Sequence, residues 1–132
     1  MIRGVHHINL LVRDLDDAMA RYRSQLGVKQ FTVDSLEGRG VRTARFLAGE
    51  TWIVLVQPVA EGEPMRVLRE RGEGLFLLSF EVESLDLAAA HVCDGGGGVA
   101  SGVRTGLDGW SVMDLDPAAL CGAPLQLTEI ND

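Results

Sequence analysis

The hydrophobic pattern of residues 4–27 returns at residues 74–97, an offset of about 70 positions. In each copy a mainly apolar run, typical of a strand, precedes a stretch whose apolar residues recur every three or four positions, as on one face of a helix. A repeat of this length predicts two similar supersecondary units. The aligned pairs are Val5 with Leu75, Ile8 with Leu78, Val12 with Val82, Leu15 with Leu85, Asp16 with Asp86, Ala18 with Ala88 and Ala20 with Ala90.

Each copy carries its own helix start signal. Asp14 and Ser84 stand just before the helical patterns, and both residue types accept hydrogen bonds from the first free backbone N–H groups of a helix. Gly27 follows the first pattern and is a typical helix stop. The sequence therefore predicts helices over residues 15–26 and 85–93.

Shorter apolar runs, separated by turn residues, fill the rest of each copy. In the first, strands are expected over residues 30–35, 41–47 and 51–57, and the last two form a hairpin. In the second, strands are expected over residues 98–104, 109–114 and 123–129. The four glycines Gly95–Gly98 follow a helix, whereas a phosphate-binding loop would place glycines between a strand and a helix, so we interpret them as a flexible turn.

These patterns predict an α+β fold made of two tandem βαβββ modules. We expect module 1 over residues 1–59, a connector with a short helix at residues 60–73, and module 2 over residues 74–132 of a single domain. Neither half has enough apolar surface to be stable alone, so the modules should form one curved mixed sheet around a concave cavity, with the helices outside.

The composition limits which classes of partner and which cellular compartment are expected. Twelve Lys and Arg against nineteen Asp and Glu give a net charge of −7, which disfavours nucleic acid, since that binding depends on cationic side chains. No apolar run approaches the ~18 residues of a membrane span, and the first strand begins close to Met1, so neither a membrane anchor nor a leader peptide is expected. Cys93 and Cys121 lack metal-ligand or redox spacing, which favours a reducing cytoplasm.

Three strings carry a resemblance that spans nearly the whole chain: GVHHINLLVRDLDDAMARY, LRERGEGLFLLSFEVESLDLAAA and GAPLQLTE. With this plan the sequence resembles the vicinal-oxygen-chelate superfamily, which includes glyoxalase I, methylmalonyl-CoA epimerase, extradiol dioxygenases and bleomycin-resistance proteins. The HHI opening and the GEGL…FEV string look most like the epimerase branch. The resemblance implies a homodimer.

The same resemblance implies a divalent metal held by one side chain from each of four strands. Carried over by position, those places are His7, Val54, Leu77 and Gln126. Valine and leucine have no lone pairs, and one neutral imidazole with one neutral amide is a weak donor set for a cation that favours several N or O ligands. We therefore predict no metal and no other cofactor.

Alternation along the strands predicts what lines the cavity instead. If His7 faces the cavity, then Val54, Leu77 and Gln126, the other three places that the resemblance assigns to metal ligands, face it too. The same alternation adds Asn9, Trp52, Ser79 and Glu81 to the lining. Apolar walls with a few polar groups are typical of a small-molecule site. His7 and Gln126 are equally consistent with structural roles, Trp52 with a core residue or a stacking surface, and Glu81 with an ordinary paired carboxylate or a base of raised pKa.

Three functions fit this lining. The first is a ligand-binding protein of the bleomycin-resistance type that holds an apolar or aromatic metabolite or antibiotic without a metal. The second is a metal-independent isomerase, epimerase or lyase for an acyl-CoA or 2-oxo acid, with His7 and Glu81 in acid–base catalysis. The third is a metal-dependent enzyme with an atypical site that uses His7 and Gln126.

Overall fold

The structure, a computed structural model, describes residues 1–130. Its contacts divide the chain into two compact units: residues 1–7 together with the chain from Leu77 onward, here called the terminal unit, and Ile8–Phe76, here called the central unit. Strands β1 (Ile2–Leu11) and β5 (Gly74–Val82) each pass from one unit into the other.

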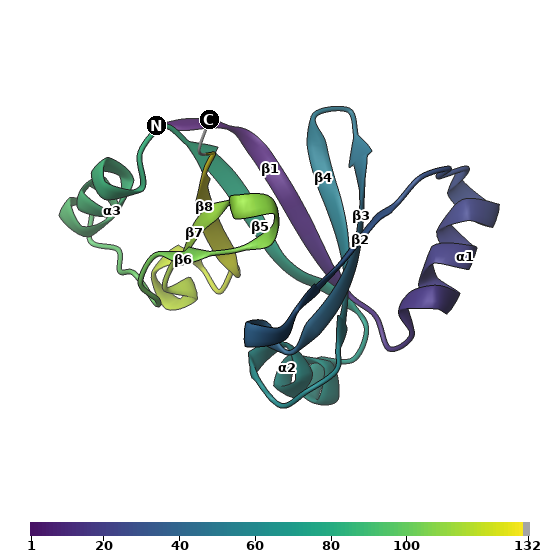
Figure 1. Ribbon diagram of the computed structural model, residues 1–132. Helices are drawn as coiled ribbons and strands as arrows, with labels where there is room; N and C mark the ends of the chain where they lie inside the picture. Colours follow the sequence, from purple (N-terminus) through teal and green to yellow (C-terminus); the bar gives the residue numbers. More distant parts are fainter. Residues whose placement is uncertain (131–132) are drawn as a thin grey trace. The chain divides into compact units, whose positions relative to one another are not determined.

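The central unit contains α1 (Leu15–Leu26), β2 (Thr32–Leu36), β3 (Val41–Ala48), β4 (Thr51–Pro58) and α2 (Glu63–Arg71), which Figure 1 shows in purple to teal. Its strands are hydrogen-bonded in the order β2-β3-β4-β1. Strands β3 and β4 form the predicted hairpin, with Ala48 opposite Thr51 at its tip. Helix α1 buries its apolar face in a cluster made of Val12, Leu15, Ala18, Met19, Ala44 and Leu55.

Both ends of α1 follow from the local sequence. The Asp14 carboxylate accepts a 3.0 Å hydrogen bond from the Asp17 backbone N–H, as an N-cap does. Gly27 ends the helix in the left-handed conformation, with φ of 69°, which glycine adopts at little cost. The predicted bounds of this helix are confirmed.

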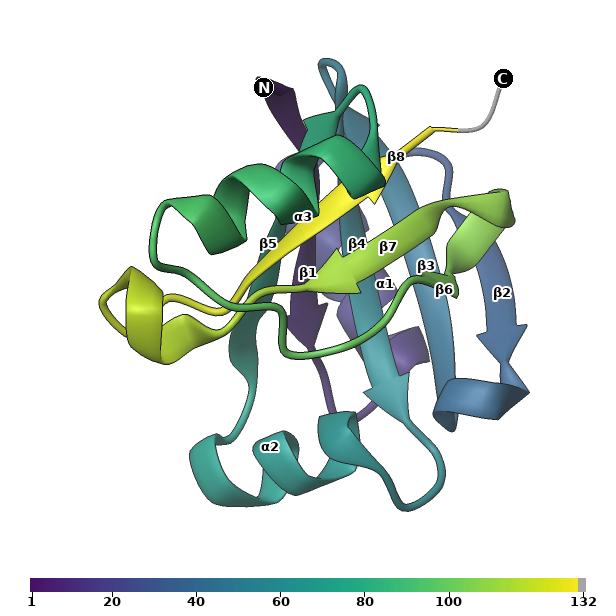
Figure 2. The same cartoon turned by 90° about the vertical axis from the view of Figure 1, so that its left-hand side faces the viewer.

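The terminal unit contains α3 (Leu85–Asp94), β6 (Arg104–Thr105), β7 (Ser111–Asp114) and β8 (Leu125–Glu129), with 3₁₀ turns at Leu107–Gly109 and Pro117–Leu120. The strand order is β1-β5-β8-β7-β6, with β5 parallel to β8 and β7 antiparallel to it. In Figure 2 helix α3 lies over strand β8, and its buried face packs on that side of the sheet. The cluster beneath it contains Val82, Leu85, Ala88, Met113, Leu115 and Leu127.

The prediction of a strand over residues 98–104 is wrong. Val99 makes one isolated bridge with Leu115, and regular pairing is confined to Arg104 and Thr105. The segment contains Gly98 and Gly102, which have no side chain to pack on a sheet and weaken strand formation. Strand β2 also begins two residues later than predicted, and α2 begins at Glu63 with Pro64 in its first turn.

The α+β class with two βαβββ modules is confirmed, because β1-α1-β2-β3-β4 is followed by β5-α3-β6-β7-β8. The concave cavity between the modules stays a prediction. Within residues 1–130, no helix combines the length and apolar character that a membrane crossing requires.

Candidate functional site

Two adjacent histidines of β1 lie buried in the terminal unit. The Nδ1 atoms of His6 and His7 are 2.8 Å apart, so one imidazole donates its Nδ1–H and the other accepts it. Only 3% of His7 is exposed to solvent. The contact fixes the orientation of both rings.

Trp110 covers this pair. Its ring stacks on His7 with 5.0 Å between centroids and meets the edge of His6 at 4.5 Å. The turn at Leu107–Gly109 places it there: Asp108 and Gly109 both have positive φ, and the Trp110 N–H donates to the Leu107 carbonyl at 2.9 Å. Sequence reasoning missed Trp110, although the Asp108–Gly109 dipeptide before a strand is a recognised turn signal.

Burial sets the charge of the histidine pair. It lowers the pKa of His7 to about 3, with a further lowering from the neighbouring His6, while Gln126 acts in the opposite direction. Burial also lowers the pKa of His6, against the raising influence of Glu81. Both imidazoles are therefore neutral at physiological pH, each with a donor and an acceptor nitrogen.

Gln126 on β8 is held by a polar network. Its Nε2 donates to Asp114 Oδ1 at 3.0 Å, and Arg104 donates to Asp114 Oδ2 at 2.7 Å. The Asp114 N–H donates in turn to Ser101 Oγ at 3.0 Å. These contacts fix the amide orientation, with Gln126 Oε1 buried and turned away from Asp114, and the interaction of Gln126 with His7 raises the pKa of that imidazole.

The predicted residues of β5 lie near this network. Ser79 is paired in register with Gln126, and its hydroxyl lies 2.5 Å from that of Thr128, with both residues fully buried. Glu81 makes an ion pair with Arg3 at 3.6 Å, and a quarter of its side chain is exposed. Leu77 is half-buried. The terminal unit thus brings His7 and Gln126 together.

Three predicted site residues belong to the central unit. Trp52 lies under the Arg45 guanidinium, 5.1 Å from its ring centroid, and Arg45 is paired with Asp34 at 2.5 Å. Val54 is 1% exposed and is paired with Arg45 across β3 and β4. Asn9 is half-buried, and its Oδ1 has no hydrogen-bond partner within the described chain.

The residues present do not fit the family's divalent metal. No three His, Cys, Asp or Glu side chains gather in a way that could hold an ion within residues 1–130. Val54 and Leu77 offer no donor atoms, which leaves His7 and Gln126 as the donors among these four places. Hard and borderline cations favour more N or O ligands than one imidazole and one amide supply.

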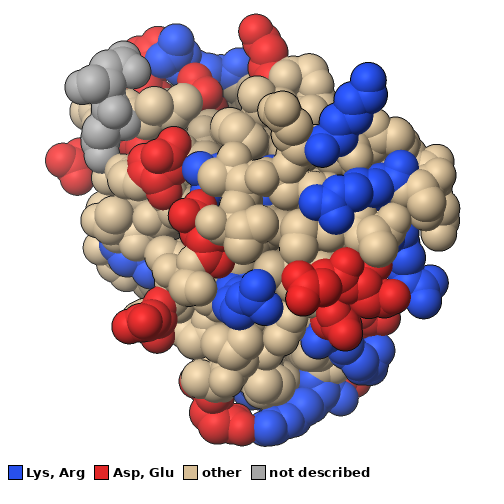
Figure 3. All heavy atoms as spheres, turned by 45° about the vertical axis from the view of Figure 1, so that its right-hand side comes forward, with Lys and Arg blue, Asp and Glu red and all other residues tan. Residues whose placement is uncertain are grey.

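Charged side chains are distributed without a large basic area on the face drawn in Figure 3, where acidic and basic groups lie next to one another. The arginine cluster of α2 follows this pattern. Arg66 is bound to Glu63 and to Glu70, the latter at 2.8 Å, and Arg69 is bound to Glu61 at 2.6 Å. These arginines are therefore neutralised locally.

Residues 6–113 match the family model described as the Glyoxalase/Bleomycin resistance protein/Dioxygenase superfamily. A curated relative, the ethylmalonyl-CoA/methylmalonyl-CoA epimerase of Cereibacter sphaeroides, is 28% identical over 98% of this chain and 100% of its own length.

The chain is also similar to solved structures over nearly its whole length. A hypothetical protein of Bacillus halodurans C-125 superposes with a TM-score of 0.93 at 25% identity, covering 97% of this chain and 94% of its own. A Streptomyces coelicolor methylmalonyl-CoA epimerase variant, in complex with 2-nitronate-propionyl-CoA, superposes with a TM-score of 0.90 at 25% identity over the whole of both chains. The resemblance inferred from the repeated strings is confirmed.

Proposed function

The chain belongs to the glyoxalase/bleomycin resistance protein/dioxygenase superfamily, and we propose that it is an isomerase or epimerase that moves the proton next to the carbonyl of a CoA thioester. One observation carries the proposal: the end-to-end similarity to an ethylmalonyl-CoA/methylmalonyl-CoA epimerase, which covers 98% of this chain and all of the relative. The alignment therefore leaves out no module of either protein. This order of preference reverses the one drawn from the sequence, where binding without turnover came first.

His7 is the proposed base. Burial keeps its imidazole neutral, so that a lone pair is available at physiological pH, but a pKa of about 3 makes it a weak base in the free protein. A carboxylate brought close by a malonyl-type acyl group would raise that pKa, because an opposite charge favours the imidazolium. Gln126 also raises the pKa of His7 and would stabilise the imidazolium that forms when His7 takes the proton.

In this step the Cα–H bond breaks, an N–H bond forms on His7, and the electron pair moves into the thioester as an enolate. A single base returns the proton to the face from which it came, so epimerisation also needs a second proton donor. Glu81 is the proposed candidate, since it lies two residues beyond Ser79 on the same face of β5. As the carboxylic acid it would give its proton to the opposite face of the enolate, and water would then return a proton to Glu81 and accept the one held by His7. No step is assigned to a metal, because the donor set does not fit one.

Proton exchange tests the proposal directly. Methylmalonyl-CoA and ethylmalonyl-CoA are incubated with the protein in deuterated buffer, and deuterium at Cα is followed by mass spectrometry. We expect protein-dependent exchange that is lost in His7→Ala and kept in Leu87→Ala, a control at an exposed position of α3. Absence of exchange, or equal exchange in both variants, would contradict the proposal.

A second candidate is binding without turnover, in which the protein holds an apolar or aromatic metabolite or antibiotic. The observation that favours it is the pair of aliphatic residues, Val54 and Leu77, at places where the resemblance implies metal ligands. Titration calorimetry distinguishes the candidates, since a pure binder gives heat of binding with a ligand but no exchange at Cα. The expected homodimer and cytoplasmic location stay predictions, and light scattering would measure the first.

A further inference from the structure

The terminal unit has a cavity on the sheet face opposite to Gln126. Leu125 and Leu127 of β8 line it, whereas Gln126 stands between them and points the other way, because successive side chains of a strand alternate. Phe80 of β5 lines it in the same manner, while Ser79 lies on the Gln126 side, where its hydroxyl meets Thr128. The cavity is therefore separate from the His7 site.

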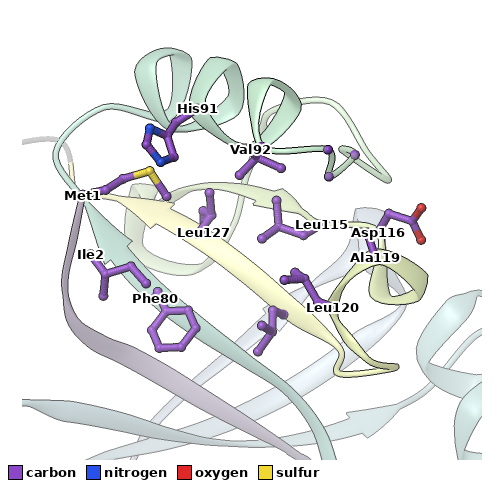
Figure 4. A pocket seen from close by; sticks show the side chains of 15 residues that line it. Met1, Ile2, Phe80, His91, Val92, Leu115, Asp116, Ala119, Leu120 and Leu127 are labelled. Atoms are coloured by element: carbon purple, nitrogen blue, oxygen red, sulfur yellow. The ribbon is translucent and has the colours of Figure 1, made fainter.

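Helix α3 and the loops at its end enclose this space. Figure 4 shows Val92 of α3 above, Phe80 and Leu127 of the sheet below, and Ala119 and Leu120 of the second 3₁₀ turn at one side. The cavity has a volume of about 310 Å³. Sites for small organic molecules begin at roughly this size, about 300 Å³.

The glycine run forms part of the wall and lets the chain approach α3. A Cβ added at Gly97 would lie 2.8 Å from Val92 Cγ1, closer than such atoms come. The Gly97 N–H donates to the Val92 carbonyl at 2.9 Å, which holds the loop against the end of the helix. The glycines thus give this wall a backbone surface with no side chains to fill the cavity.

We propose that this cavity binds a small, uncharged, mainly hydrocarbon or aromatic molecule. Its lining is largely apolar, and the ionisable groups of the lining residues are the His91 imidazole, the Asp116 carboxylate and the α-amino group of Met1. The Asp116 carboxylate and the net charge of −7 disfavour an anion. A bound apolar molecule would cover Phe80 and Leu125, which are only half-buried in the free protein, and removal of such surface from water stabilises the complex.

The small apolar area around the cavity opening favours a small molecule over a second copy of the chain. The exposed large apolar side chains at the cavity are Met1, Ile2 and Leu120. A stable protein interface buries about 800 Å² on each partner. Three side chains around a concave opening supply far less apolar contact than that, whereas a ring system inside the cavity is surrounded on several sides.

Equilibrium dialysis with the neutral probe N-phenyl-1-naphthylamine tests this inference on the full chain. Ala119→Trp places a bulky ring at a lining position, and Ala118→Trp is the matched control at the neighbouring exposed residue, which does not line the cavity. We expect saturable binding of one probe per chain, weakened about tenfold or more by Ala119→Trp, a loss equivalent to about 1.4 kcal/mol, and unchanged by Ala118→Trp.

Two further measurements keep the inference open to refutation. Leu120→Glu places a charge at the opening and should also weaken binding, whereas His7→Gln should leave it unchanged, which separates this cavity from the proposed thioester site. Probe binding that is not saturable, that responds equally to Ala118→Trp and Ala119→Trp, or that follows the oligomeric state measured by light scattering would overturn the inference.

Discussion

Replacement of His7 by glutamine should reduce the sensitivity of the fold to acid. In the folded protein the pKa of His7 is lowered from 6.5 to about 3, mainly by burial and secondly by His6. The unfolded chain therefore binds one more proton than the folded chain at pH values between these two. The stability that the neutral, buried His7 contributes is fully present above pH 6.5. It is lost as the pH falls through that window, so acid favours unfolding.

The magnitude follows from the two pKa values. Each unit of difference corresponds to about 1.36 kcal/mol, and the unfolded His7 is half-protonated at pH 6.5, so between pH 6.5 and pH 4.5 His7 alone should lower the free energy of unfolding by about 2.3 kcal/mol. Carboxylates that do not contact His7 titrate in both proteins, and their contributions cancel when the variant is compared with the parent chain. Glutamine does not titrate, and it retains hydrogen-bonding groups at this buried position.

Urea unfolding at several pH values between 7 and 4.5 measures the effect. The free-energy difference between His7→Gln and the parent chain should change by about 1.4 kcal/mol per pH unit below about pH 5.5, where the unfolded His7 is almost fully protonated, in favour of the variant as the solution becomes more acidic. His91→Gln, at an exposed histidine of α3, is the control and should change much less. Parallel pH profiles for His7→Gln and the parent chain would refute a buried neutral His7.

Three other outcomes are expected. Ser79→Ala leaves the buried Thr128 hydroxyl without its partner and should lower the free energy of unfolding by about 1–3 kcal/mol, with partial recovery in Ser79→Ala/Thr128→Val, by urea unfolding. Asp14→Ala removes the N-cap of α1 and should cost about 1 kcal/mol, whereas Asp16→Ala, which loses no cap, should cost less. Dialysis against a chelator should leave the thermal midpoint of the purified protein unchanged, and a fall would contradict the poor fit of its donor set to a metal.

Local signals in the sequence were sufficient for the regular elements. The period-3.6 pattern with Asp14 and Gly27 at its ends fixes α1, because caps and apolar spacing act within a few residues of each other. The internal repeat then predicts the second module by analogy with the first. The segment over residues 98–104 breaks the analogy, since Gly98 and Gly102 weaken a strand that the repeat alone would require.

The site was less accessible to sequence reasoning because its contacts come from distant segments. The register of β7 with β8 places Asp114 opposite Gln126, and no pattern within either strand predicts that pairing. Arg104 reaches the same carboxylate from the neighbouring strand. Alternation groups Ser79 with Gln126, as the register of β5 with β8 does, but it cannot say which polar side chain becomes the partner of which.

Trp110 changes what His7 can do chemically. An exposed histidine on a strand has a pKa near 6.5, whereas burial beneath the stacked indole and beside His6 keeps this imidazole neutral. A neutral ring beside a fixed amide offers hydrogen-bonding groups and fewer N or O ligands than a divalent cation favours. The segment over residues 98–104, which was expected to be a strand, thus precedes the turn at Leu107–Gly109, and that turn positions Trp110 against His7.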